Sequence, residues 1–227
     1  MDTLFKTYGF NINEKKKLLF NNYYNDLVEK NKVMNLTAIT NKNEVIVKHF
    51  LDSVLPLNFI KDNSKVLDIG SGAGFPGIPL KIMNNTLDVT LLDSLNKRIN
   101  FLNEEIHKLN LLNIKAIHAR AEEYVNVSRE TFDYVVSRAV AKLNTLLEYC
   151  LPYVKMGGYF IAYKSVGAEE EIEISRKALK ILGGQVEKVK KLNVEGLDRT
   201  LIYIKKVAVT PKKYPRGQNK PKNEPIL

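Results

Sequence analysis

The sequence predicts an α/β protein whose sheet is mostly parallel and closes with an antiparallel strand. Two observations predict this fold. Short β-rich segments alternate with helical ones from residue 65 onward, and the last two β-rich segments are separated by only a short turn. Such alternation is typical of parallel strands joined by crossover helices. Two strands joined so closely can pair only as a hairpin, so one strand must run antiparallel.

The first sixty residues are predicted to be helical. Apolar side chains recur at helical spacing after the polar pair Asn13-Glu14, and the pattern holds to Val28. A second amphipathic helix fits the segment from Glu44 to Val54. We expect residues 1–60 to form a helical extension that packs on the core of the protein.

Seven β-rich segments make up the predicted sheet, in a domain that covers residues 61–207. Among the helical stretches between them, one carries an apolar stripe from Leu95 to Leu109, with Ser94 as its expected N-cap. The seven segments are KVLDIG (65–70), DVTLLDS (88–94), IKAIHA (114–119), FDYVVSRA (132–139), GGYFIAYK (157–164), QVEKVKKLNV (185–194) and RTLIYIKK (199–206).

Residues 208–227 are predicted to be a basic, proline-rich tail. From Lys205 to Leu227 there are seven Lys and Arg residues and one Glu, together with four of the eight prolines. Such a composition cannot bury a core, so we expect the tail to be extended or disordered by itself. One interpretation is a solubilising tail. The other is an RNA-binding arm in which Tyr214 stacks on a base and phosphates are bound by Lys212, Lys213, Arg216, Lys220 and Lys222.

Composition limits the class of protein further. A chain of 227 residues with 44% hydrophobic content suffices for one sizeable domain and an appendage. No apolar run is long enough to cross a membrane, and the first residues lack the pattern of a signal peptide. The single cysteine, Cys150, allows no internal disulfide, so we expect a cytoplasmic protein. His49 and His118 lack metal-ligand spacing, so we expect no bound metal. Separately, we expect the protein to be a monomer.

A glycine-rich loop follows the first strand, in the stretch VLDIGSGAGFPGIPL. Glycine is favoured where the backbone needs a positive φ or where another molecule approaches closely. Gly72, Gly74 and Gly77 match the GxGxxG pattern of nucleotide-binding turns. Asp93 ends the next strand, where an acidic side chain can bind ribose hydroxyls. A structural turn alone would explain the glycines, but both features together favour a cofactor that contains a nucleoside.

The surroundings of the loop indicate which cofactor it binds. A dinucleotide needs a helix N-terminus facing its pyrophosphate, whereas here Phe75-Pro76 crowds the loop and Asp68 adds negative charge. A carboxylate suits a cationic amine and sulfonium, which favours S-adenosylmethionine. The pattern from Val66 to Gly74 resembles motif I of class I methyltransferases. This resemblance implies their Rossmann-like fold, a seven-stranded sheet with helices on both faces.

The acceptor is narrowed by what the end of the fourth strand lacks. The segment SRAVAK differs from the D/N-P-P-Y motif of enzymes that methylate exocyclic amines. Cys150 lies too far along the following helix to serve as the thiol that pyrimidine C5 methylation needs. No Asp ends the fourth strand, as a Lys-Asp-Lys-Glu set for ribose methylation would need. An acceptor that needs no activation remains, and guanine N7 is one because it presents a lone pair in its normal protonation state.

Nearly the whole chain resembles the RsmG (GidB, glucose-inhibited division protein B) family of bacterial small-subunit rRNA guanine-N7 methyltransferases. The motifs that carry the resemblance are NLTAIT, KHFLDS, DIGSGAGFPGIPLKI, LLDSLNKR, RAEEY, SRAVAKL and TPKKYPR. The resemblance implies methyl transfer from S-adenosylmethionine to N7 of a guanine in the decoding-centre loop of 16S rRNA. The acceptor would be naked 16S rRNA, protein-bound rRNA or a small-subunit particle.

The resemblance also implies site residues. It places Gly70, Phe75, Ala121, Glu122 and Arg138 at the cofactor, where we also expect Asp68, Gly72, Gly74 and Asp93. Arg138 and Lys164 are expected to be catalytic, although Arg138 could instead be a surface cation that pairs with a helix carboxylate. Ser165 stands after Lys164, where we expect the family to favour glycine. Asn35 either caps a turn or lines the acceptor pocket.

Two other functions fit parts of the sequence. An NAD-dependent oxidoreductase would share the glycine-rich loop and half of the fold. A non-catalytic RNA-binding protein with a vestigial cofactor loop would share the basic tail, but the presence of both Gly70 and Asp93 argues against it.

Overall fold

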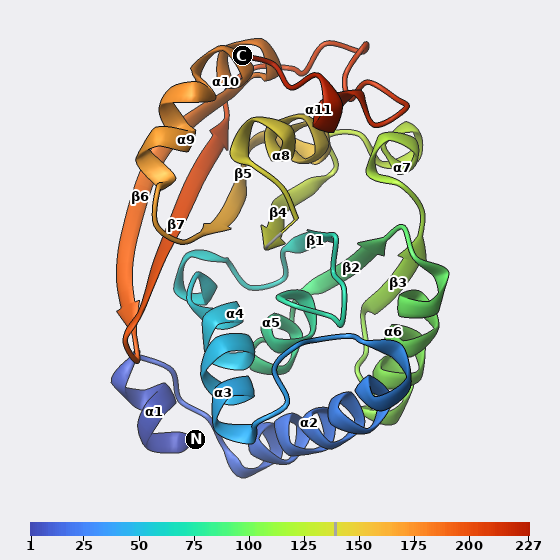
Figure 1. The fold of residues 1–227 in the computed structure, drawn as a ribbon, viewed down its shortest axis with the longest axis vertical. Coiled ribbons are helices and arrows are strands. Elements are labelled where there is room, and N and C mark those ends of the chain that lie inside the picture. The colour runs from blue at the N-terminus through green and yellow to red at the C-terminus, as the bar shows by residue number, and fades with distance from the viewer. Residues whose placement is uncertain (139) are drawn as a thin grey trace.

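The computed structural model describes residues 1–138 and 140–227. Its centre is a seven-stranded sheet with the order β3-β2-β1-β4-β5-β7-β6 (Figure 1). β7 runs antiparallel to both of its neighbours, and the remaining pairs are parallel. The predicted parallel sheet with a closing hairpin is therefore confirmed. The strands are β1 (Lys65–Ile69), β2 (Asp88–Asp93), β3 (Ile114–His118), β4 (Phe132–Arg138), β5 (Val154–Lys164), β6 (Gly184–Val194) and β7 (Leu197–Lys206).

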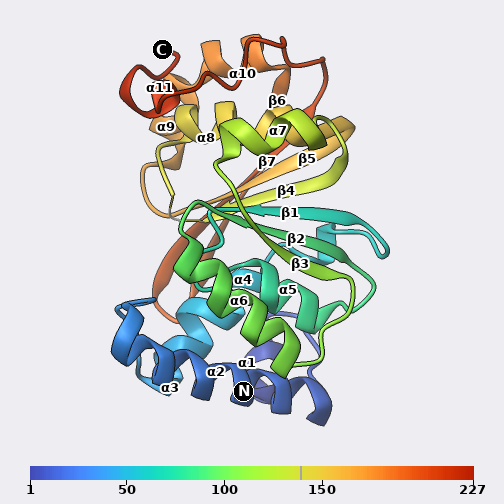
Figure 2. The same ribbon diagram turned by 90° about the vertical axis from the view of Figure 1, so that its right-hand side faces the viewer.

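Helices cover both faces of the sheet (Figure 2). One layer holds α1 (Asp2–Thr7), α2 (Glu14–Met34), α3 (Lys42–Val45), α4 (Asp52–Val54), α5 (Gly77–Met83) and α6 (Asn96–Lys108). The other holds α7 (Ala121–Ser128), α8 (Leu143–Cys150), α9 (Ala168–Ile174), α10 (Arg176–Leu182) and α11 (Lys220–Asn223). Short 3-10 turns occur at Leu57–Phe59 and Leu151–Tyr153. No helix in the described part of the chain combines the length and the apolar character needed to cross a membrane.

The two predicted N-terminal helices are confirmed. α2 begins after Asn13, whose side chain accepts the Lys16 amide hydrogen at 2.9 Å. Its apolar stripe packs on the following helix, where the Tyr23 and Phe50 rings stack with centroids 5.5 Å apart. That second helix runs without a break through α3, a π-helical turn at Ile46–Leu51 and α4. π-helical turns occur frequently at functional sites, and this one carries residues that line a pocket described below.

The expected N-cap of α6 is wrong. Ser94 does not cap the helix. The capping position is held by Leu95, whose side chain cannot accept a hydrogen bond. The Leu95 amide instead donates to the Asp93 carboxylate at 2.9 Å. A carboxylate accepts hydrogen bonds more strongly than a hydroxyl does, so Asp93 serves the helix start as well as the pocket described below.

The expectation of an extended or disordered tail is also wrong. The tail has four buried residues, Thr210, Tyr214, Pro221 and Ile226. The side chains of Tyr214 and Ile226 join the core of the second layer together with α8. The prediction failed because average composition conceals a few well-spaced apolar residues, which suffice to hold a segment on a core that the rest of the chain supplies. The division of the chain at residues 60 and 207 stays a prediction.

Glu105 on α6 is a fully buried carboxyl group. Neither of its oxygens has a hydrogen-bond partner among the described residues. Burial raises the pKa of Glu105 to about 8, and the negative charge of Asp26 acts in the same direction. The folded protein therefore holds Glu105 protonated at neutral pH, whereas the unfolded chain ionises it.

We expect Glu105→Gln to reduce the pH dependence of the free energy of unfolding. The ordinary pKa of this group is 4.5, so from that pH up to about 8 unfolding releases its proton. Glu105 then lowers the stability by about 1.4 kcal/mol for each pH unit, and its contribution becomes constant above the folded-state pKa. Urea titrations of both proteins between about pH 5 and pH 8 measure the difference. Two stability profiles with the same slope would contradict the prediction.

Candidate active site

Two glycines of the loop between β1 and α5 lie close to side chains of other segments. Gly70 has a φ of 74°, and a Cβ there would lie 2.5 Å from the Val140 side chain. A Cβ on Gly77 would lie 2.2 Å from Leu91 and 2.9 Å from the Asp68 carboxylate. A side chain at Gly77 would push the start of α5 away from the strands, whereas one at Gly70 would displace Val140 and strain the backbone. Gly70 thus keeps open the space above the end of β1, whereas Gly77 lets the start of α5 lie on the strands.

Asp68 lies beneath this loop. One carboxylate oxygen accepts the Gly77 amide hydrogen at 2.8 Å, and the other has no hydrogen-bond partner within residues 1–138 and 140–227. The side chain is completely buried, and burial raises its pKa to about 7. Near neutral pH Asp68 is therefore only partly ionised. It attracts a cationic cofactor less strongly than a fully ionised carboxylate would. Its contact with a cofactor stays a prediction.

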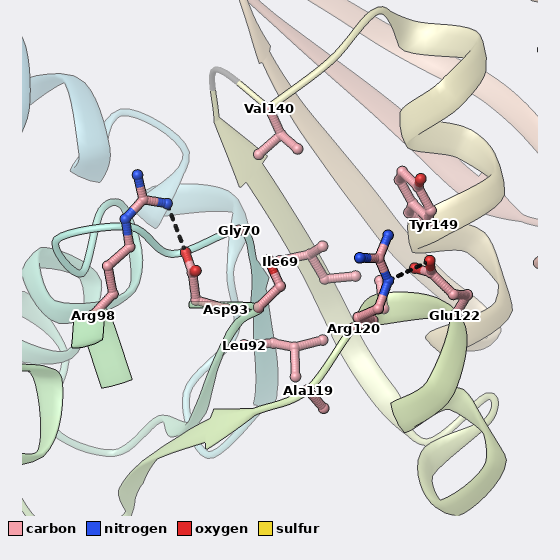
Figure 3. A pocket seen from close by; sticks show the side chains of 12 residues that line it. Ile69, Gly70, Leu92, Asp93, Arg98, Ala119, Arg120, Glu122, Val140 and Tyr149 are labelled. Carbon is pink, nitrogen blue, oxygen red and sulfur yellow. Dashed lines mark hydrogen bonds and ion pairs between the residues drawn. The ribbon is translucent and has the colours of Figure 1, made fainter. Parts of the chain in front are cut away.

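A cavity of about 330 Å³ lies at the carboxyl ends of β1, β2 and β3 (Figure 3). Four of the predicted cofactor residues line it, namely Gly70, Asp93, Ala121 and Glu122. The other lining residues are Ile69, Leu92, Ser94, Arg98, Ala119, Arg120, Val140 and Tyr149. We call this cavity the first pocket. Its walls combine apolar side chains with a few charged ones at its two ends, as is usual for small-molecule sites.

Asp93 is fixed at one end of the first pocket. One of its oxygens accepts the Gly72 amide hydrogen at 2.9 Å and lies 3.3 Å from the Arg98 guanidinium. The other accepts the Leu95 amide hydrogen. These bonds orient the carboxylate, and Figure 3 shows it at the edge of the cavity beside Arg98. Because a carboxylate oxygen can accept more than one hydrogen bond, Asp93 can still bind a ligand hydroxyl.

We expect Asp93→Ala to weaken binding of S-adenosylhomocysteine far more than it slows turnover at saturating cofactor. The loss of a charged hydrogen-bond partner costs about 1.5–3 kcal/mol. Asp88→Ala is a matched control, because Asp88 is exposed at the opposite end of the same strand. Calorimetric titration measures both affinities. Unchanged affinity in a folded Asp93→Ala protein would reject the assignment.

Phe75 connects the loop to the N-terminal helices and does not line the first pocket. Its ring stacks on His49, with centroids 4.6 Å apart. The Arg138 guanidinium lies 5.2 Å from the ring centroid on Phe75. Gly72 and Gly74 also lie outside the pocket lining, and the latter faces the Tyr23 hydroxyl in the core. The structure thus gives these three predicted cofactor residues positions that shape the loop, and their contact with a cofactor stays a prediction.

A second cavity, of about 450 Å³, brings Arg138 and Lys164 together. We call it the second pocket. Its remaining lining residues come from the N-terminal helices, β5, β7, α9 and the loops that follow α2, β4 and β5. They are Ile39, Lys48, His49, Asp52, Ala141, Tyr163, Ser165, Glu171 and Arg199. Val140 lines the first pocket, whereas Arg138 and Ala141 line the second. The two pockets are therefore bordered by neighbouring residues of the chain, Val140 and Ala141.

Asp52 is the centre of the charge network in the second pocket. Its two oxygens bind Arg138 at 2.7 Å and Arg199 at 2.6 Å. Arg138 also donates to the backbone carbonyls of Lys48 and His49 in the π-helical turn. Arg138 therefore does pair with a helix carboxylate, as its alternative interpretation predicts. The contact is nevertheless buried in a pocket, since only 13% of the Arg138 side chain is exposed.

Lys164 occupies the opposite side of the second pocket. Its ammonium group donates to the Ala141 carbonyl at 2.8 Å and to Glu171 at 2.7 Å. Ser165 also lines this pocket. Each cation that lines it from β4, β5 or β7 thus contacts a carboxylate, but Arg138 and Arg199 share Asp52, so the pocket keeps a net positive charge.

His49 is held as a neutral imidazole. Burial lowers its pKa to about 4, and the positive charge of Arg138 acts in the same direction. Its Nε2 atom lies 2.8 Å from the Thr37 hydroxyl, in the NLTAIT segment. His49 therefore holds this loop against the second pocket and adds no charge to it. Asn35, in the same segment, ends α2 with a φ of 50°, and the second pocket is lined without it.

The tail lies apart from the second pocket. Its predicted RNA-binding residues fall into two groups, one with a structural partner and one that is exposed. The Arg216 guanidinium binds both oxygens of Glu148 on α8, at 2.9 and 2.8 Å. Tyr214 is buried and cannot stack on a base as the tail is placed. Lys212, Lys213, Lys220 and Lys222 are exposed. RNA contact by these four lysines stays a prediction, whereas Arg216 has a structural partner.

Several residues of the site were not predicted from the sequence. Asp52 stood inside the quoted motif KHFLDS without an assigned role, and Arg199 and Glu171 carried no motif. Arg199 reaches the pocket because β7 enters the sheet antiparallel beside β5, where Thr200 pairs with Lys164. Arg120 and Tyr149 were missed in the first pocket. In the described part of the chain no three His, Cys, Asp or Glu side chains are grouped so that they could hold a metal ion.

The strand order and the pocket at the carboxyl edge of the sheet define the chain as a protein with the class I methyltransferase fold. A S-adenosylmethionine-dependent methyltransferase from Aquifex aeolicus has a similar structure, with a TM-score of 0.54 and 20% identity over 72% of this chain and 93% of its own. TYW2 from M. jannaschii, solved in complex with AdoMet, has a TM-score of 0.58 and 18% identity over 75% of this chain and 80% of its own.

The sequence comparisons are more specific. The chain belongs to the family described as GidB, rRNA small subunit methyltransferase G, whose model matches residues 16–202. A ribosomal RNA small subunit methyltransferase G from Lachnoclostridium phytofermentans is 53% identical over 98% of this chain and 94% of its own length. The resemblance predicted from the motifs is thereby confirmed.

Proposed function

We propose that this protein transfers a methyl group from S-adenosylmethionine to N7 of a guanine in the decoding-centre loop of 16S rRNA. The observation that carries the proposal is the pair of pockets bordered by the neighbouring residues Val140 and Ala141. One has the size and the ribose-binding carboxylate that a nucleoside cofactor needs, and the other collects the cations of the site. Membership of the rRNA methyltransferase family supports RNA as the acceptor.

The first pocket fits S-adenosylmethionine. The Asp93 carboxylate accepts hydrogen bonds from the ribose hydroxyls, and Ala121 and Glu122 at the start of α7 bind the adenine. The absence of a side chain on Gly70 leaves room for the cofactor beside Val140. The bound cofactor supplies an electrophilic methyl group on a sulfonium.

The second pocket orients the guanine. Arg138 and Lys164 are the predicted catalytic residues among the hydrogen-bond donors there, and guanine O6 is the natural acceptor beside N7. No base is required, because N7 carries a free lone pair. The chain therefore contributes position and electrostatics.

The function is tested by methyl transfer from labelled S-adenosylmethionine to small-subunit RNA from a strain that lacks this gene. We expect label in N7-methylguanosine, identified by mass spectrometry of the digested RNA. S-adenosylhomocysteine should raise the melting temperature of the protein, and NAD should leave it unchanged. Stabilisation by NAD alone would favour the oxidoreductase, and RNA binding without transfer would favour a non-catalytic protein. Comparison of naked rRNA, protein-bound rRNA and assembled subunits as acceptors identifies the substrate particle.

We propose that the exposed lysines of the tail bind rRNA phosphates. Replacement of Lys212, Lys213, Lys220 and Lys222 by glutamine should weaken RNA binding and flatten its salt dependence. Each lost phosphate contact removes about 0.7–0.9 from the slope of log K against log salt. Equal slopes for both proteins would leave these lysines a role in solubility only. Lys177→Gln, an exposed residue on α10, is the matched control.

A further inference from the structure

The last residues of the chain contact the helices that enclose one end of the first pocket. α11 lies beside α8, where the Thr145 hydroxyl donates to the Pro221 carbonyl at 3.0 Å (Figures 1 and 2). The Arg216 side chain holds Glu148 on the same helix. The next residue, Tyr149, lines the first pocket. The tail is therefore structurally continuous with a wall of that pocket.

Arg120 makes the direct connection between the tail and the first pocket. It precedes α7 and lines the pocket. Its Nε donates to Glu122 at 2.7 Å, and its Nη2 donates to the side-chain oxygen of Asn219 in the tail. Figure 3 shows the Arg120 guanidinium beside Glu122 and across from the Tyr149 ring. The two hydrogen bonds fix a long side chain that, with 43% of its surface exposed, would otherwise sample several rotamers.

We propose that Asn219 is a positioning residue that holds the Arg120 guanidinium as a wall of the adenine end of the cofactor pocket. The inference rests on the proposed cofactor. A planar guanidinium stacks on flat ring systems, and its orientation decides whether it can do so. Arg120 follows Ala119 and precedes Ala121 and Glu122, which form the same end of the pocket. The C-terminal segment thus takes part in cofactor binding from outside the sheet.

A change in the backbone conformation at residue 219 is a competing explanation for lost cofactor affinity. The variants are chosen to separate this effect from the loss of the hydrogen bond to Arg120. Asn219 has a φ of 56°, and Asn is one of the few residues that adopt this conformation readily. Asn219→Gly keeps the conformation and removes the acceptor. Asn219→Asp keeps an acceptor for Arg120 at the same position. Gln218→Gly is the matched control, because Gln218 is exposed and has a similar φ of 58°.

The test uses the full-length protein and calorimetric titration with two ligands, S-adenosylhomocysteine and 5′-methylthioadenosine, which lacks the amino-acid end. We expect Asn219→Gly to weaken both by about three- to tenfold, the usual effect of one lost hydrogen bond. The Asp variant and the Gln218→Gly control should bind as the unaltered protein does. In methyl transfer the Gly variant should raise the KM for the cofactor while kcat stays constant.

Three outcomes would overturn the inference. They are unchanged affinity in Asn219→Gly, an equal loss in Asn219→Asp, and a loss confined to S-adenosylhomocysteine, which would place the effect away from the adenine. The first control is the unaltered protein, whose failure to bind S-adenosylhomocysteine would reject the proposed function itself. Melting temperatures of all variants verify that each remains folded.

Discussion

Arg138→Ala should reduce methyl transfer at saturating cofactor by about 100-fold or more, the scale of losing a positioned hydrogen-bond donor at a reacting group. Arg138 lines the second pocket and not the first. We therefore expect the loss mainly in kcat, with a smaller effect on S-adenosylhomocysteine affinity. Single-turnover transfer to small-subunit RNA and calorimetric titration measure the two effects separately.

The fold needs its own control, because Arg138→Ala also leaves the buried Asp52 with one cationic partner instead of two. Arg138→Lys keeps a charge near Asp52 but loses the planar group over Phe75. It should restore most of the melting temperature and little of the activity. If Arg138→Ala had full turnover and only a lower melting temperature, the role of Arg138 would be purely structural.

Arg216→Ala should destabilise the protein by about 3–5 kcal/mol, since it leaves the buried Glu148 carboxylate without its charged partner. Arg216 donates to both Glu148 oxygens through its side chain and to one of them through its backbone amide. Only the side-chain bonds are lost in this variant, and no other cation contacts Glu148 among the described residues. Equilibrium unfolding in urea measures the change.

Two further variants define the origin of that loss. Lys212→Ala, at an exposed position of the same segment, should leave stability unchanged. Arg216→Leu combined with Glu148→Leu should recover most of the stability, because replacing a buried ion pair by packed apolar side chains is close to neutral. Arg216→Ala with the stability of the unaltered protein would show that the tail is not anchored by this pair. Removal of residues 210–227 would remove Arg216 and expose part of the second layer. This truncation is therefore a poor test of RNA binding.

Local patterns along the chain predicted most of the fold. All seven strands were expected from β-rich runs bounded by turns, and the short turn between the last two correctly predicted the antiparallel strand. The glycine-rich loop and Asp93 were likewise placed correctly, because a strand end followed by glycine is a local feature. The tail was predicted wrongly, because its order depends on where Tyr214 and Ile226 meet a core made by other segments.

The second pocket could be predicted only in part for a similar reason. Arg138 and Lys164 are the last residues of β4 and β5, and the carboxyl ends of parallel strands meet at one edge of a sheet. Asp52 and Arg199 join them through the packing of the N-terminal helices and the register of β7. Neither can be derived from sequence spacing. Asp68 is a different case. The structure gives its carboxylate the Gly77 amide inside the loop, which its position in the motif did not predict, and its contact with a cofactor stays a prediction.

The contact of Asp52 with both Arg138 and Arg199 has a consequence for how the protein becomes active during its own synthesis. The ribosome makes Asp52 early and Arg199 close to the end of the chain, and domains generally fold from the N-terminus as they emerge. A nascent chain can already contain the glycine-rich loop and most of the first pocket while β7 is still missing. The second pocket is complete only when the final hairpin joins the sheet, and the contact of Asn219 with Arg120 in the first pocket forms later still. A nascent chain that lacks β7 therefore has neither pocket complete, and we expect it to be unable to modify RNA.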